Sequence, residues 1–126
     1  MAKKETPERI NPIVISSPDG SKEYTLDFNR EAVALAERSG FDIDKAVENP
    51  VTGWPDLFFL AFRMHHGPRN GNISRAETDK IFEAWGGLSG EVVGRLRDLY
   101  NQAVLANAFV ENTEEIEKNS GWKVIL

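Results

Sequence analysis

Residues 70–77 have the types and spacing of one half of a calcium-binding loop. The matches to positions five, six, eight and twelve of an EF-hand loop are Asn70, Gly71, Ile73 and Glu77. Positions one and three would fall on His66 and Pro68, where calcium needs oxygen ligands. The sequence therefore predicts a helix start here, with Ser74 and Glu77 as a capping box, and no bound metal or cofactor.

Two adjacent histidines and three aspartates are the other residues that could do chemistry. His65 and His66 diverge by about 100° on a helix, so both cannot easily bind one metal ion. Asp42, Asp44 and Asp56 could form the acidic set of a hydrolase, but acidic residues near helix starts usually act as caps. The chain has no cysteine, which excludes thiol catalysis and cysteine zinc sites. We therefore expect no enzymatic activity.

Charge and composition favour a single intracellular domain. The 126 residues carry 15 basic and 20 acidic side chains, a net charge of −5, which argues against a nucleic-acid partner. The lack of cysteine and the charged N-terminus without a following apolar region predict a cytoplasmic location. No apolar run reaches the roughly 20 residues that a membrane-spanning helix needs, so no membrane partner is expected.

The elements are organised around residues 54–66, WPDLFFLAFRMHH, the most apolar run in the chain. Its composition predicts a helix that starts near Pro55, stops at Gly67 and lies in the middle of the core, because it is apolar almost all round. The expected core comprises Leu57, Leu60, Phe62 and Met64, packed against Ile81, Trp85, Leu96, Leu99 and Tyr100. On this basis Leu60→Ala is expected to cost roughly 2–5 kcal/mol.

The remaining patterns predict a mainly α fold, a small bundle of about four to five helices with an N-terminal β-hairpin. Strands are expected at 10–16 and 22–28, and further helices at 30–39, 43–48, 74–86 and 89–110. Gly94, inside the last of these helices, is expected to mark a close helix–helix approach. We place a mobile tail at 1–9, a single helical domain at 10–110, and an acidic linker with an apolar C-terminal segment at 111–126.

The apolar C-terminal segment follows a strongly acidic stretch. Residues 111–120 carry four Glu and one Lys, and the large apolar side chains after them are Trp122, Val124, Ile125 and Leu126. Burial of apolar surface contributes about 25 cal/mol per Å², so we expect these four residues to bind a partner or a second copy, the latter giving a homo-oligomer. Two modes are open: strand addition at the edge of 10–16, or insertion into a groove of another protomer. The alternative is a disordered end.

The order and residue types of four segments resemble a known family. The segments are YTLDFNREAV, LFFLAFRMHHG, NISRAETDKIFEAWGG and LRDLYNQAV, which lie within residues 24–110. They are similar to the tail assembly chaperones of long-tailed bacteriophages and prophages. The resemblance implies a small, acidic, mostly helical, non-catalytic protein that binds the tape measure protein, keeps that long hydrophobic chain soluble and helps recruit tail tube subunits.

In that family the chaperone acts in the host bacterial cytoplasm and is absent from the finished virion. The alternative interpretation is a helix-loop-helix adaptor or regulatory module of degenerate EF-hand character, based on the half-matching loop at 70–77. Calcium binding separates the two interpretations, because only the second expects it.

Overall fold

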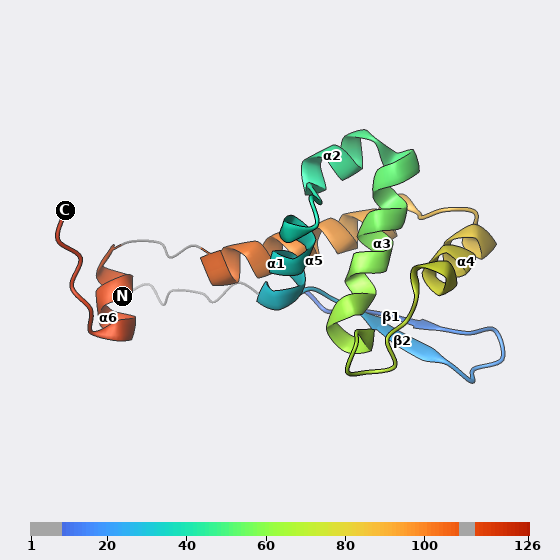
Figure 1. The fold of residues 1–126 in the computed structure, drawn as a ribbon, viewed down its shortest axis with the longest axis horizontal. Helices are drawn as coiled ribbons and strands as arrows, with labels where there is room; N and C mark the ends of the chain where they lie inside the picture. The colour runs from blue at the N-terminus through green and yellow to red at the C-terminus, as the bar shows by residue number, and fades with distance from the viewer. Residues whose placement is uncertain (1–8, 109–112) are drawn as a thin grey trace.

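The computed structural model describes residues 9–108 and 113–126 as a helical fold with an N-terminal hairpin (Figure 1). The elements are β1 Ile13–Ser16, β2 Glu23–Leu26, α1 Arg30–Arg38, α2 Ile43–Glu48, α3 Pro50–His66, α4 Arg75–Trp85, α5 Gly90–Ala108 and α6 Thr113–Ser120. The predicted mainly α class with a hairpin is confirmed. The described residues form more helices than expected, because the acidic stretch contains α6. The tail expected at 1–9, apart from Arg9, and the helix end at 110 lie outside the described residues.

The turn between β1 and β2 is held together by one carboxylate. Asp19 Oδ1 accepts hydrogen bonds from Ser17 Oγ at 2.7 Å and from the Ser21 backbone N–H at 3.0 Å. Gly20 takes a left-handed conformation with φ 74°, which a residue with a side chain rarely adopts. The hydrogen bond from the Ser21 backbone, together with those from the Ser21 and Ser17 hydroxyls, lowers the pKa of Asp19 to about 2.

The central helix α3 begins earlier than the sequence suggests. Pro50 lies in its first turn, where the missing N–H is not needed, so the predicted start near Pro55 is wrong. Pro55 lies inside the helix and lacks the N–H that would bond to the Val51 carbonyl. Val51 is 88% exposed, so water can reach this part of the helix. The Val51 carbonyl can therefore bond to water, and residues 50–54 stay helical although Pro55 donates no hydrogen bond.

Gly53 lets α2 and α3 pack with their backbones in contact. A Cβ atom at Gly53 would lie 2.3 Å from both the Cα and the carbonyl oxygen of Ala46. The close approach predicted at Gly94 is wrong, because no heavy atom lies within 4 Å of the position of its Cβ. Gly94 shares a face of α5 with the exposed residues Asp98 and Leu105.

The core lies on one side of α3, where β2, α1 and α5 cover the helix. Its most deeply buried side chains are Leu26, Leu57, Phe58, Phe62, Leu96 and Leu99. The expected core positions Leu60 and Met64 are only partly buried, as is Ile81, and Trp85 is 46% exposed. The other expected core residues are buried: Leu57, Phe62, Leu96, Leu99 and Tyr100. Leu60 and Met64 were placed too deep because α3 is apolar on several faces, and Leu60 lies one turn after the half-exposed Asp56.

Candidate functional site

The predicted partner-binding residues are exposed to solvent after α6. The exposed fractions are 78% for Trp122, 37% for Val124, 95% for Ile125 and 106% for Leu126. The segment is neither helix nor strand, and among the described residues it does not pair with β1. Within a single copy these apolar side chains therefore remain available for a partner.

Helix α6 holds the start of this segment through local backbone contacts. Gly121, with φ 76°, donates its N–H to the Glu117 carbonyl oxygen at 2.7 Å. The Val124 N–H donates to the Glu117 carboxylate at 3.0 Å. Glu114 and Glu115 in the first turn and Lys118 in the last turn also suit the helix dipole. The acidic stretch thus forms a short helix, and the apolar residues follow its C-terminal end.

Further large apolar side chains are exposed on the body of the protein. They are Val14 in β1, Leu35 in α1, Val51 in α3, Trp85 in α4 and Leu105 in α5. Val51 is 88% and Leu105 is 62% exposed, whereas the Trp85 ring still contacts Phe58 with 5.3 Å between centroids. Single exposed apolar residues are normal on a protein surface. Together with the C-terminal residues, however, they offer apolar contacts both on the helical body and after α6.

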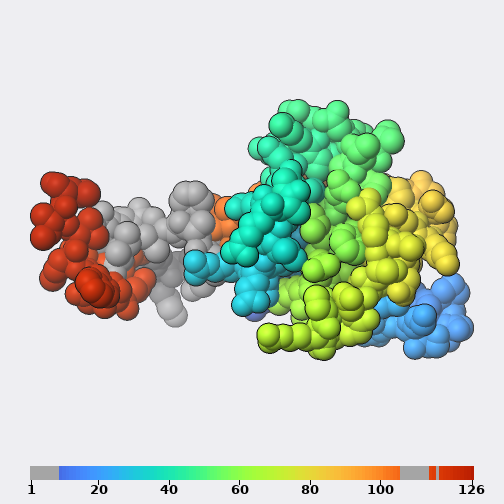
Figure 2. Space-filling model, in the orientation of Figure 1, coloured from blue at the N-terminus to red at the C-terminus, as the bar shows by residue number. Residues whose placement is uncertain are grey.

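Two hollows adjoin α3. Figure 2 shows α1 and α4 flanking this helix on the surface. One hollow of about 520 Å³ lies between α1 and the end of α3 and includes Leu35, Arg63 and Met64. The other, of about 200 Å³, lies between α2 and the start of α3. The Arg63 Nε atom is buried and has no hydrogen-bond partner among the described residues, although the guanidinium lies 5.7 Å from the Phe59 ring centre. The lining is mixed in character and singles out no ligand.

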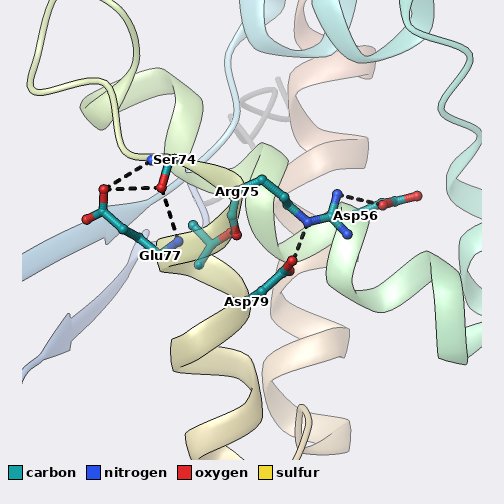
Figure 3. A network of polar contacts seen from close by, with 6 residues as sticks. Asp56, Ser74, Arg75, Glu77 and Asp79 are labelled. Atoms are coloured by element: carbon teal, nitrogen blue, oxygen red, sulfur yellow. Dashed lines mark hydrogen bonds and ion pairs between the residues drawn. The ribbon is translucent and has the colours of Figure 1, made fainter.

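The residues that half-match a calcium loop form a helix cap, as predicted (Figure 3). The Glu77 N–H donates to Ser74 Oγ at 3.1 Å, and the Ser74 hydroxyl donates to Glu77 Oε1 at 3.2 Å. Gly71 and Asn72, with φ of 83° and 44°, turn the chain before the buried Ile73. The Glu77 carboxylate, which would be the twelfth-position calcium ligand, is therefore engaged in the capping box.

Of the three candidate aspartates, Asp42 and Asp56 line the same hollow between α2 and the start of α3, whereas Asp44 is not part of its lining. Asp42 caps α2 by accepting hydrogen bonds from the backbone N–H groups of Asp44 and Lys45. Asp56 instead accepts a hydrogen bond from Arg75 Nη1 at 2.9 Å, which links α3 to α4 (Figure 3). No group of three His, Asp or Glu side chains that could hold a metal ion occurs within residues 9–108 and 113–126.

Arg75 also bonds to a second carboxylate. Its Nε donates to Asp79 Oδ1 at 2.8 Å, one turn further along α4. Burial opposes the charge on Arg75, but the hydrogen bonds and charges of Asp79 and Asp56 outweigh it and raise the pKa of Arg75. All three side chains are more than two fifths exposed, so each ion pair contributes only about 0–1 kcal/mol. Through the bond from Arg75 to Asp56, this network positions α4 against α3.

His66 has a role that the sequence did not indicate: it attaches β2 to α3. The Thr25 N–H donates to His66 Nε2 at 2.9 Å, and the Asp27 N–H donates to the Ala61 carbonyl at 3.0 Å. The His66 ring also lies edge-on to the Tyr24 ring, with 5.1 Å between centroids. Burial, and to a lesser extent the neighbouring charge of His65, lowers the pKa of His66. The neutral imidazole therefore acts as a structural acceptor.

We expect the free energy of unfolding to fall as the pH is lowered below about 6.5, the ordinary pKa of histidine. His66 has a lower pKa in the folded chain, so the unfolded chain binds more protons in the range between the two values. The contribution of His66 to the free energy of unfolding is complete above pH 6.5 and is lost as the pH falls toward the pKa of His66 in the folded chain. Urea unfolding between pH 5 and pH 7.5 measures this slope.

A His66→Gln variant should lose the part of the slope that His66 contributes, whereas His65→Gln should keep most of it. Equal pH dependence of the wild type and His66→Gln would show that protonation of His66 does not affect folding.

No helix among the described residues is both long enough and apolar enough to cross a membrane.

Comparison with known proteins identifies one relationship. A family model described as "Domain of unknown function (DUF5055)" matches residues 1–126. No curated protein and no solved structure matches the chain. The family match extends over the hairpin, all the described helices and the apolar C-terminal segment.

Proposed function

We propose that this chain, which belongs to the DUF5055 family over its whole length, is a tail assembly chaperone of a long-tailed bacteriophage or prophage. It binds the tape measure protein, keeps that chain soluble and helps recruit tail tube subunits during tail morphogenesis. It acts without catalysis in the host bacterial cytoplasm. The proposal rests on the resemblance of residues 24–110 to that chaperone family and on the apolar side chains that the structure leaves exposed.

The observation that carries the proposal is the exposed apolar surface on an acidic protein. A chaperone for a long hydrophobic helix needs apolar side chains that are open to solvent before the client binds. Val51 and Leu105 on the helical body and Trp122 in the C-terminal segment meet this requirement. The net charge of −5 would help keep the complex soluble after these side chains are covered.

The adaptor interpretation has less support. Its calcium loop would need the Glu77 carboxylate as a ligand, and this group bonds to Ser74. We therefore expect no heat of binding and no rise in melting temperature when calcium is titrated into the purified chain. Stoichiometric calcium binding with stabilisation would favour the adaptor over the chaperone.

Co-expression with the proteins encoded by neighbouring open reading frames tests the chaperone proposal. A tagged chain should capture one very long, coiled-coil-like protein. The double variant Val51→Ser and Leu105→Ser should capture less of it, because both side chains are exposed and apolar. Arg97→Ser is the control, because Arg97 is also exposed on α5 and its replacement leaves the exposed apolar side chains in place. Capture of no such protein by the wild type would contradict the proposal.

A further inference from the structure

One edge of the hairpin is open. Directly after the last ladder pair, Ser16 with Glu23, Ser17 donates its N–H to the Lys22 carbonyl at 2.8 Å, which fixes the phase of the hydrogen-bond alternation along the ladder. Alternation along the observed register then turns the N–H and C=O groups of Val14 and Ser16 away from β2. No described residue bonds to these outward groups. β1 therefore presents a free edge to a further strand.

The opposite edge of the hairpin is partly covered by α3. Outward groups on β2 belong to Glu23, Thr25 and the following residue Asp27, and the N–H groups of Thr25 and Asp27 bond to His66 and Ala61 of α3. An incoming strand therefore finds its longer run of free backbone groups on β1. Pro12 limits that edge on its N-terminal side, because proline has no N–H to donate.

We propose that residues 122–126 of one copy add as an antiparallel strand to β1 of a second copy. The pairing places Leu126 opposite Ile13, Ile125 opposite Val14, Val124 opposite Ile15 and Lys123 opposite Ser16. Four of these five residues are apolar and exposed, and Trp, Val and Ile are frequent in strands. The backbone pairing supplies affinity, and the side-chain rows supply the register.

The rows on both faces of the hairpin match this register. Ile13 and Ile15 pack partly against the core, so Leu126 and Val124 extend an existing apolar row. On the other face, Lys123 would lie opposite Ser16, whose partner on β2 is Glu23. The positive Lys123 and the negative Glu23 would then project from the same face, on either side of Ser16. A shift by one residue would move every side chain to the other face and lose both matches.

A second copy fits this arrangement better than the same copy. Figure 1 shows the C-terminal segment and the hairpin turn at opposite ends of the molecule, and Glu117 holds the Val124 N–H close to α6. Each copy offers one free edge and one strand, so a reciprocal exchange closes a two-fold dimer. Val51 and Leu105 take no part in the proposed strand pairing.

Sedimentation velocity of the full chain over a range of concentrations tests the dimer. The wild type should dimerise, and Val14→Pro, which removes an outward N–H, should abolish dimerisation. Lys123→Glu should raise the dimer dissociation constant roughly fivefold, because it places like charges together without touching the hairpin. Adding Glu23→Lys to Lys123→Glu should restore the wild-type value.

Leu105→Ser is the control, since it removes an exposed apolar side chain outside the proposed interface. Circular dichroism confirms that each variant is folded. A wild-type chain that stays monomeric at every concentration would overturn the proposal. So would Val14→Pro and Lys123→Glu variants that associate as the wild type does, or a charge-swapped pair that fails to restore association. Client capture is measured separately, so a monomeric chain that still captures its client would overturn only the dimer.

Discussion

Leu57→Ala lowers the free energy of unfolding by about 3–5 kcal/mol, whereas Leu60→Ala lowers it by less than about 2 kcal/mol. Both substitutions remove the same atoms from the same helix. Leu57 is fully buried between α3 and its neighbours, so its removal leaves a cavity. Leu60 is only partly buried, and water can occupy much of the space that it leaves.

Urea denaturation of the two variants measures this difference, with the denaturant slope checked for two-state unfolding. The comparison also corrects the expectation from sequence, which placed Leu60 in the core. Equal losses of unfolding free energy at the two positions would mean that α3 buries Leu60 as deeply as Leu57.

Gly53→Ala destabilises the protein by about 3 kcal/mol, although alanine is the better helix former. The new methyl group would lie 2.3 Å from the backbone of Ala46, which cannot move away as a flexible side chain could. Helix α2 must shift as a whole to relieve the contact. The cost therefore reflects the packing of α2 against α3.

Gly94→Ala is the matched control, because its Cβ would enter open space on α5. It should stabilise the protein by about 0.5–1 kcal/mol through helix propensity alone. Thermal melting of both variants beside the wild type gives the two signs directly. A neutral Gly53→Ala would show that α2 does not pack against α3 at this distance.

Local signals predicted the ends of most elements. Helix α1 begins at Arg30 as expected, after the cap Asn29, and Ser74 and Glu77 form the expected capping box of α4. Gly86, where that helix was expected to end, takes a left-handed conformation. Each depends on residues within one turn of the chain, so the sequence contains the necessary information. The start of α3 was missed because Pro50 and Pro55 both satisfy the rule for a first-turn proline.

The side of α3 that faces the core could not be predicted in the same way. Phe58, Phe59, Leu60 and Phe62 give the helix several apolar faces, so periodicity alone does not choose between them. The choice is made by β2 and α5, which are distant in sequence. The bond from Thr25 to His66 was missed for the same reason, because it joins residues that only the folded chain brings together.

For the C-terminal segment, too, the sequence predicted one part of the candidate site and only the folded chain revealed the other. Composition alone identified Trp122 and its apolar neighbours as unusual, and the structure leaves them exposed. The free edge of β1 required knowledge of which backbone groups α3 already uses, and the sequence does not contain this directly. Strand register follows from alternation only after both edges of the hairpin are assigned.

The chaperone proposal is tested most directly by the solubility of its client. The long, coiled-coil-like protein from a neighbouring open reading frame is expressed in bacteria with and without this chain, and the soluble fraction of that long protein is measured. We predict that it is largely insoluble alone and becomes soluble in a stable complex with this chain. An unchanged soluble fraction, with no complex formed, would contradict the proposed function.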